Sequence, residues 1–350
     1  MTQLTDFSLQ AVPGKPFTIL QLTDMQFIDA SQKRTPDRLS PWSNEWWQPE
    51  NLEKIALTRI RRTVAEAEPD MIVITGDMIY GQFDDNGSMH RRLCECMGSF
   101  GIPWAPVFGN HDCETALGVD WQCDLYAHAP GCLFARGSVT GNSNYTVGIY
   151  EGDSLVRVLF MMDANCCFGG TDPALYKASA FGEDQVAWLQ HTADRIRETL
   201  GRTVPAFLCC HIPPADMHTA LVDAGYASPE TVGGALRFRI GEEPAGMEPV
   251  FAPASPGDMG YTDRPVNVLS NRIEPQLIRS GVDGVFCGHC HETTLSVAHG
   301  PIRYTFGVKC GTYDHHYEGL MGGTKITLPA DRNGFVLQHM YEGPMGEKVR

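Results

Sequence analysis

Short apolar runs alternate with polar, glycine-rich connections along this chain, a pattern typical of sheets joined by helices. Three runs in the first third predict buried strands: residues 17–23, 71–75 and 103–108. Between the first two, four apolar residues share one helical face: Leu52, Ile55, Ile60 and Val64. Pro49 suits a first helical turn, so a helix is predicted over residues 49–67. The resulting strand–helix–strand unit predicts a parallel strand pair.

The remaining two thirds continue this alternation with longer interruptions. A hairpin is predicted over residues 144–162 and an amphipathic helix over residues 183–200. Two shorter helices are expected over residues 91–100 and 273–280. Further strands are expected over residues 204–210, 282–287, 294–298, 302–308, 324–327 and 334–340. Residues 212–270, rich in Pro and Gly, are interpreted as a long insertion, and residues 294–350 as an antiparallel closing section.

The composition describes a globular protein with an acidic surface. Hydrophobic residues make up 43% and charged residues 20% of the 350 positions, which suits a sizeable core. We expect one domain over residues 1–350. The net charge of −15 argues against a nucleic-acid-binding surface and against binding to anionic membranes. An acidic protein that acts on an anionic substrate needs local positive charge, which metal ions can supply.

Targeting signals and cysteines bear on the compartment. Residues 1–10 lack a secretory signal, and no apolar run approaches the roughly 18 residues of a membrane span. A cytoplasmic location is therefore expected, with the 12 cysteines as reduced thiols. Cys287 and Cys290 have the spacing of a structural zinc pair, but no second pair follows at zinc-ribbon spacing. The oligomeric state is not predicted.

Polar side chains follow the predicted strands at the points where they end. They are Asp24, Asp77 with Tyr80, Asn110 with His111, His211, and His289 with His291. Each alone is compatible with an ordinary turn or a structural histidine. Together they form a set of nitrogen and oxygen donors without thiolate, which suits Fe, Mn or Zn. The set is large enough for two ions, which a shared carboxylate holds about 3.5–4 Å apart.

The order of these motifs resembles the calcineurin-like metallophosphoesterase superfamily. The motifs span residues 18–291: Asp24, Gly76-Asp77, Gly109-Asn110-His111-Asp112, His211 and Gly288-His289-Cys290-His291. The resemblance implies an α/β fold, a four-layer α/β/β/α sandwich of two mixed sheets flanked by helices. It also implies hydrolysis of phosphoric esters through attack of a metal-bound hydroxide.

One position departs from the superfamily pattern. Most members begin with Asp-x-His, and here Gln26 stands where that histidine is expected. Tyr80 follows Asp77 by three residues, and Gly-Asp-x-x-Tyr resembles the purple acid phosphatase branch, in which a tyrosinate selects Fe(III). Residues 102–104 and 311–317 also resemble the short single-domain members of that branch.

The resemblance implies two metal sites and a set of catalytic side chains. The first site, for Fe(III), comprises Asp24, Asp77, Tyr80 and His291. The second, for Fe(II), Zn or Mn, comprises Asp77, Asn110, His211 and His289, with Asp77 as the bridge. His111 is expected to stabilise the phosphate charge or protonate the leaving group, and Asp112 to orient its ring. His218 is a further candidate near the leaving group.

Three functions are compatible with this sequence. The first is a phosphomonoesterase of the purple acid phosphatase type that acts on a small phosphorylated substrate. The second keeps the fold but cuts diesters, either cyclic nucleotides or phospholipid-type diesters, with manganese or zinc. The third is a catalytically inactive scaffold that binds a protein partner, an interpretation that Gln26 motivates. Substrate choice is assigned to the loops at residues 28–48 and 212–270.

Overall fold

The structure of the protein is a computed structural model. It describes residues 3–29, 49–81, 84, 86–165, 181–226, 238–239, 259, 261–262, 270–291, 293–314, 316 and 318–341. Most of the predicted loop at residues 28–48 and much of the predicted insertion at residues 212–270 lie outside the described residues.

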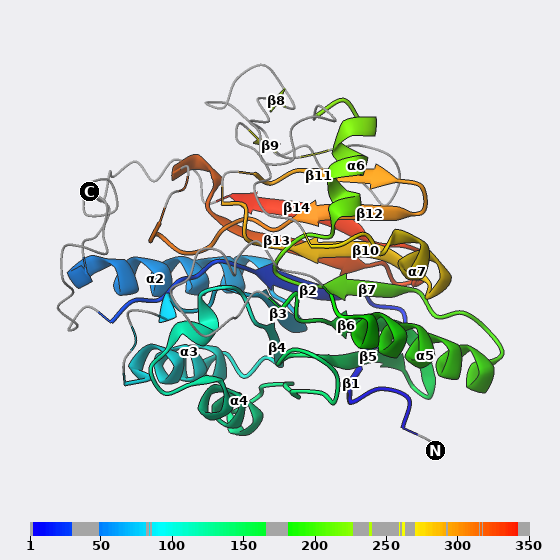
Figure 1. Cartoon of the computed structure of the whole chain (residues 1–350), viewed down its shortest axis with the longest axis horizontal. Helices are drawn as coiled ribbons and strands as arrows, with labels where there is room; N and C mark the ends of the chain where they lie inside the picture. Colours follow the sequence, from blue (N-terminus) through cyan, green and yellow to red (C-terminus); the bar gives the residue numbers. More distant parts are fainter. Residues whose placement is uncertain are drawn as a thin grey trace.

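Two mixed sheets form the centre of the molecule (Figure 1). The larger has seven strands in the order β1 (Phe7–Gln10), β5 (Tyr145–Glu151), β6 (Ser154–Met161), β7 (Ala206–Cys209), β10 (Val282–Cys287), β12 (Ile302–Phe306) and β11 (Ser296–His299). The smaller has five strands in the order β14 (Val336–Tyr341), β13 (Gly322–Leu328), β2 (Phe17–Leu22), β3 (Met71–Thr75) and β4 (Trp104–Val107). A separate pair consists of β8 (Phe238–Arg239) and β9 (Tyr261–Thr262).

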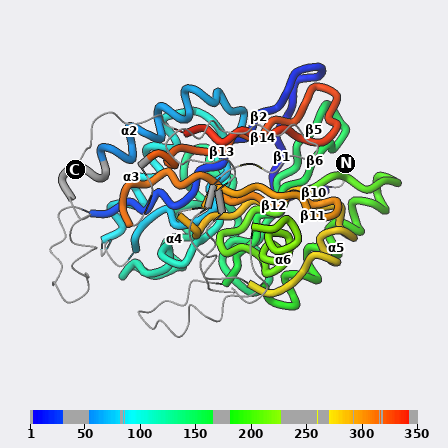
Figure 2. Tube along the Cα trace, turned by 90° about the horizontal axis from the view of Figure 1, so that it is seen from above, coloured from blue at the N-terminus to red at the C-terminus, as the bar shows by residue number. Residues whose placement is uncertain are grey.

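Helices cover the outer faces of both sheets. On the side of the five-stranded sheet lie α2 (Pro49–Ala67), α3 (Ser88–Ser99) and α4 (Val119–His128). On the side of the seven-stranded sheet lie α5 (Glu183–Leu200), α6 (Ala215–Asp223) and α7 (Glu274–Arg279). Seen from above, α2, α3 and α4 lie in the left part of the molecule and α5 and α6 in the right part (Figure 2). The expected four-layer α/β/β/α sandwich is confirmed.

The apolar runs become the buried centre of this sandwich. All five residues of β3 are buried, because its neighbours β2 and β4 flank it and both faces of its sheet are covered. Burial of each Val, Ile or Leu side chain there stabilises the fold by about 1.5–3 kcal/mol. The pairs β2–β3 and β3–β4 are parallel, as the strand–helix–strand pattern predicts. The carboxyl ends of these three strands therefore meet at one edge of the sheet.

The predicted helices at residues 49–67 and 183–200 are confirmed with the same bounds. The predicted helix at residues 91–100 begins earlier, at Ser88, after Gly87 in a left-handed conformation with φ 71°. Several elements were not predicted from the sequence: β1, α4 and, within the predicted insertion, α6, β8 and β9. Strand β1 is only four residues long and half-buried, and α4 carries apolar residues with little helical periodicity.

The predicted closing section differs from the structure in its organisation. The antiparallel pair β11–β12 belongs to the seven-stranded sheet, where β12 lies parallel to β10. The antiparallel pair β13–β14 belongs to the five-stranded sheet, where β13 pairs with β2. The end of the chain therefore crosses from one sheet to the other. The expected antiparallel pairing is present, but it is divided between the two sheets.

For the described residues, the structure gives the state of the cysteines and shows whether any helix could cross a membrane. Nine described cysteines are free thiols, as expected. Cys113 is disulfide-bonded, so the expectation of reduced thiols throughout is wrong at this position. Among the described residues, no helix has the length and apolar character needed to cross a membrane.

Candidate metal centre

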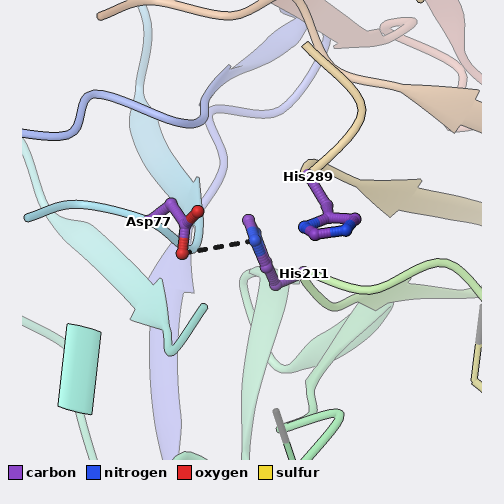
Figure 3. A group of neighbouring side chains, drawn as sticks. All are labelled: Asp77, His211 and His289. Carbon is purple, nitrogen blue, oxygen red and sulfur yellow. Dashed lines mark ion pairs between the residues drawn. The ribbon is translucent and has the colours of Figure 1, made fainter. Parts of the chain in front are cut away.

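The strand-end donors converge where the two sheets meet. Asp77 follows β3 of the five-stranded sheet, whereas His211 and His289 follow β7 and β10 of the seven-stranded sheet. Figure 3 shows the His211 ring between the Asp77 carboxylate and the His289 ring. The distance from Nε2 of His211 to Oδ1 of Asp77 is 3.3 Å, and both side chains are buried. Neither sheet alone supplies this group.

Asp77 belongs to two groups of possible metal ligands. One ligand atom each from Asp77, His211 and His289 lie within 4.8 Å of one another. The same limit holds for one ligand atom each from Asp24, Asp77 and His291. In the second group, Nε2 of His291 is 3.2 Å from Oδ1 of Asp24. The Asp77 carboxylate is therefore placed where a bridging ligand would be required.

Asn110 joins the group that contains the two histidines. Its Oδ1 atom lies 3.1 Å from Nε2 of His211 and 3.0 Å from Nδ1 of His289. The other nitrogen of His211, Nδ1, donates to the carbonyl oxygen of Thr75 at 2.7 Å. This bond fixes the orientation of the ring and turns Nε2 towards Asp77 and Asn110, the orientation that metal-binding histidines usually have.

The backbone adopts unusual conformations at several candidate ligands. Asp24, Asp77 and His289 have positive φ angles of 51°, 49° and 71°. A left-handed conformation at a residue other than Gly costs about 1 kcal/mol or more and is found preferentially at functional sites. Gly288 has a different reason to be glycine, because a Cβ atom there would overlap Thr23 Oγ1 and the Asp24 carboxylate.

Charge and burial make these side chains suitable for cations. Burial works to raise the pKa of Asp24, but its bond to His291 and the nearby positive charges hold that pKa at about 2. Asp77 behaves similarly, because His211 and His111 outweigh the effect of burial and keep its pKa well below the ordinary value. Burial and His211 lower the pKa of His289 to about 3. Two carboxylates are thus ionised and His289 is neutral at pH 7.

The chemistry and the surroundings of these side chains are suited to metal ions. Nε2 of His289 is buried and has no hydrogen-bond partner among the described residues. A buried nitrogen without a partner is costly unless a ligand completes it. Both groups consist of imidazole and carboxylate donors without thiolate, which matches the preferences of Fe, Mn and Zn. The residues present therefore fit two cations.

His111 borders this cluster but has a different partner from the one predicted. Its backbone N–H donates to Oδ1 of Asp77 at 3.0 Å, and its ring Nδ1 lies 2.9 Å from Oε2 of Glu114. Burial works to lower the pKa of His111, yet Glu114 and Asp77 raise it to about 10. Glu114 was missed from the sequence, although its i+3 spacing from His111 is a usable signal.

Asp112 does not orient the His111 ring, so that prediction is wrong. Its Oδ1 atom accepts the backbone N–H groups of Met78 and Ile79 at 2.8 and 3.1 Å. Its Oδ2 atom accepts the N–H of Gly109 at 2.6 Å. The fully buried carboxylate ties together the two turns that carry Asp77 and Asn110. Its contribution to the site is therefore to hold these turns in register.

Tyr80 lies beside His111. The two rings stack with centroids 4.1 Å apart and an interplanar angle of 21°. Burial and neighbouring carboxylates raise the pKa of the Tyr80 phenol well above its ordinary value. Ionisation of Tyr80 therefore requires a compensating cation, and its predicted coordination of iron remains a prediction.

Two further predicted positions have defined surroundings. His218 is buried on α6, the helix that begins shortly after His211, and its role remains a prediction. Gln26 is buried, and its Oε1 atom accepts from Nζ of Lys309 at 2.5 Å. Lys309 was not recognised in the sequence. A lone lysine after an apolar strand was its only available signal.

A four-layer sandwich with imidazole and carboxylate donors at its strand ends defines the class of metallophosphoesterases. The chain matches the model of the calcineurin-like phosphoesterase family over residues 17–293 and belongs to that family.

Several relatives carry names from the purple acid phosphatase branch. An Arabidopsis thaliana protein named "Probable inactive purple acid phosphatase 14" is 25% identical over 316 residues, which cover 83% of this chain and 72% of that protein. Another from the same plant, "Probable inactive purple acid phosphatase 28", is 37% identical over 227 residues, which cover 56% of this chain and 53% of that protein. These relatives agree with the predicted branch.

Two solved structures are similar in fold. A dimetal phosphatase from Danio rerio has a TM-score of 0.45 and 11% identity, with 94% of this chain and 100% of that chain covered. A purple acid phosphatase from yellow lupin seeds has a TM-score of 0.48 and 11% identity, with 97% of this chain and 53% of that chain covered.

Proposed function

We propose that the protein is a dinuclear-metal phosphoesterase that hydrolyses phosphomonoesters. The observation that carries this proposal is the position of Asp77, which belongs to both groups of possible ligands. A single shared carboxylate at the junction of two donor sets is the arrangement that a two-metal hydrolase needs. The ionised state of Asp24 and Asp77 supplies the negative charge that balances two cations.

Each side chain has a defined task in this proposal. Asp24, Asp77 and His291, with Tyr80, would hold one cation, and Asp77, Asn110, His211 and His289 the other. When bound, the two cations would neutralise the phosphate charge and lower the pKa of water in the site. Thr75 keeps His211 in the tautomer that presents Nε2 to the site.

His111 would act on the substrate rather than on the metals. With its pKa raised to about 10, its ring is protonated at neutral pH. A protonated imidazole would donate a hydrogen bond to a phosphate oxygen or a proton to the leaving alkoxide. Glu114 and the stacked Tyr80 ring hold the ring in place.

The preference for monoesters rests on the purple acid phosphatase features. Tyr80 stands at the position that resembles the tyrosinate of that branch, and Fe(III) is accordingly proposed at the first site. Fe(II), Zn or Mn is proposed at the second. A phosphodiesterase with the same ligands is the alternative within this class, and a direct comparison of substrates decides between the two.

A second candidate function is a catalytically inactive binding protein. Two observations favour it: Gln26 replaces an expected histidine ligand, and relatives carry the word "inactive" in their names. Such a protein would keep the fold and part of the ligand set but would not turn over phosphoric esters.

Metal analysis combined with a substrate panel tests the proposal. The protein would be loaded separately with iron, zinc and manganese, and assayed against phosphomonoesters and diesters. We expect two metals per chain and faster turnover of monoesters. In His289→Ala, turnover should fall by at least ~100-fold, more than loss of an outer partner of a metal ligand costs. His128→Ala, at an exposed histidine on α4, is the matched control.

The outcomes separate the candidates. Two bound metals with faster turnover of diesters would replace the monoesterase by the diesterase. Bound metal without turnover of either ester would favour the inactive binding protein. A chain that takes up none of the three metals would overturn the proposal of a metalloenzyme altogether.

A further inference from the structure

Gln26 is held between a donor and an acceptor. Its Oε1 atom accepts from Nζ of Lys309 at 2.5 Å, and its Nε2 atom lies 3.4 Å from Oδ2 of Asp77. An ammonium group can only donate hydrogen bonds, and a carboxylate can only accept them. Both neighbours therefore require the same orientation of the amide. Rotation by 180° would place the amide NH2 group against the ammonium group and the amide oxygen against the carboxylate.

Lys309 is fixed in position by the segment that carries it. This segment leaves β12 and runs beside the turn after β2, where Thr23 and Lys309 form a parallel bridge. The N–H of Gly311 donates to the carbonyl oxygen of Asp24 at 3.0 Å. Nζ of Lys309 donates to the same oxygen at 3.1 Å. A Cβ atom at Gly311 would overlap the Met25 carbonyl, so the segment approaches closely because residue 311 is glycine.

Burial makes this arrangement rigid. Lys309 is 1% exposed and Gln26 is 2% exposed. A buried ammonium group requires acceptors, because its loss of hydration is otherwise too costly. The Gln26 oxygen is one of these acceptors and is consequently directed at Lys309. It is not available to a cation beside Asp24, Asp77 and His291.

We infer that Gln26 and Lys309 are positioning residues for Asp77: Lys309 holds the amide oxygen away from the first metal site, and the amide nitrogen donates to Asp77 Oδ2. This inference rests on the proposed function, because it concerns the same metal centre. Gln26 stands where a histidine ligand is expected but serves as a hydrogen-bond donor to the bridging carboxylate. Without an oxygen from residue 26, the first site has only the proposed ligands Asp24, Asp77, Tyr80 and His291, and it binds its cation more weakly than an added oxygen ligand would allow.

A double-mutant cycle on metal binding tests this inference. Wild type, Lys309→Met, Gln26→Ala and the double variant would be titrated with Mn²⁺ by calorimetry, with electron paramagnetic resonance to detect the paired ions. Lys309→Met releases the amide, so its oxygen can turn towards the first site. We expect the first-site affinity to rise about tenfold, equivalent to one added favourable contact. In the Gln26→Ala background the same substitution should change the affinity by less than about threefold.

Two further variants keep the test decisive if Lys309→Met does not fold. Gln26→Glu retains an acceptor for Lys309 and adds an oxygen next to Asp77, so it should raise first-site affinity for Mn²⁺ by at least tenfold (~1.4 kcal/mol). Lys325→Met removes the same charge from β13 and should leave the affinity unchanged.

Each outcome has one meaning. An equal effect of Lys309→Met with and without Gln26 would show that Lys309 acts through charge alone, and would overturn the inference. Unchanged affinity in Gln26→Glu would also overturn it, since residue 26 would then not face the first site. Both results leave the proposed function intact when wild type binds two Mn²⁺ ions. Failure of wild type to bind Mn²⁺, Fe or Zn would remove the proposed function and this inference with it.

Discussion

Nδ1 of His111 lies 2.9 Å from Oε2 of Glu114, and the two side chains are 14% and 7% exposed. This pair fixes the rotation of the imidazole from one side, while the stacked Tyr80 ring restricts it from the other. In the proposed function, Nε2 is the ring nitrogen that would face a substrate oxygen. We therefore expect Glu114 to contribute to the proposed activity through His111, although it is neither a proposed metal ligand nor part of a recognised motif.

Removal of the Glu114 charge should slow catalysis without loss of metal. Glu114→Gln keeps the shape of the side chain but no longer stabilises a protonated His111. We expect kcat to fall about 10- to 100-fold, a large part of what a positioned acid contributes, with two metals retained. Glu95→Gln, an exposed glutamate on α3, is the control. Equal kcat values in Glu114→Gln and wild type would contradict this role.

Colour tests the assignment of Tyr80. Iron-loaded protein should absorb visible light through charge transfer from the Tyr80 phenolate to Fe(III), and Tyr80→Phe should abolish the band. Tyr313→Phe is the matched control, because its ring packs edge-on against Tyr80 at 4.9 Å. The measurement is an absorption spectrum at equal iron content. A colourless, iron-loaded and active wild type would remove Tyr80 from the ligand set.

The buried cation of Arg157 should be essential for stability. Arg157 is 1% exposed, forms an ion pair with Asp283 and lies over the Phe207 ring at 4.2 Å. Arg157→Ala would leave a cavity and an unpaired carboxylate. Loss of one partner of a buried pair costs about 3–5 kcal/mol. Because the Asp283 side chain is 31% exposed and partly screened by solvent, we expect the free energy of unfolding to fall by ~3 kcal/mol. Urea unfolding measures this change, with Arg197→Ala, in a more exposed pair on α5, as the control.

Two buried histidines away from the metal centre should make the fold sensitive to acid. Burial lowers the pKa of His90 to about 3, with a contribution from Arg91, and that of His339 to about 4. The unfolded chain binds these protons near pH 6.5, so it holds more protons than the folded chain between the two pKa values. The free energy of unfolding therefore falls as the pH falls from about 6.5 to 4, by ~1.4 kcal/mol per pH unit for each histidine.

Urea unfolding between pH 7.5 and 4.5 measures this dependence. In His90→Gln, the free energy of unfolding should change less steeply with pH than in wild type. The difference corresponds to one proton, because one of the two histidines no longer titrates. A slope that is the same in His90→Gln and wild type would show that His90 is protonated in the folded protein.

The sequence places the proposed ligands at strand ends, for a physical reason. A buried strand is a short apolar run, so the first acid, amide or histidine after it marks the strand end. Asp24, Asp77 and Asn110 are predicted from this pattern, and the structure brings them together with His211 and His289. Helix bounds are predicted equally well where apolar periodicity is strong, as at residues 49–67.

Other features depend on pairings that no local pattern encodes. The apolar run of β7 does not indicate that its sheet differs from that of β3. Asp112 stands next to His111 in sequence, but the turn directs its carboxylate to the backbone of Met78 and Ile79. Lys309 reaches Gln26 across a sequence separation of 283 residues. These relationships arise from tertiary structure and become visible only there.

The candidate ligands come from two different sheets, which has a consequence for unfolding. Asp77 and His211 lie on opposite sides of the boundary between the layers, so any event that parts the layers also disperses the ligand set. Bound cations would then stabilise the packing of the two sheets against each other. Because they bind only the folded state, the free energy of cation binding adds to the free energy of unfolding. Chelation should accordingly speed amide exchange in β3 and β7 together, as one cooperative opening rather than two separate ones.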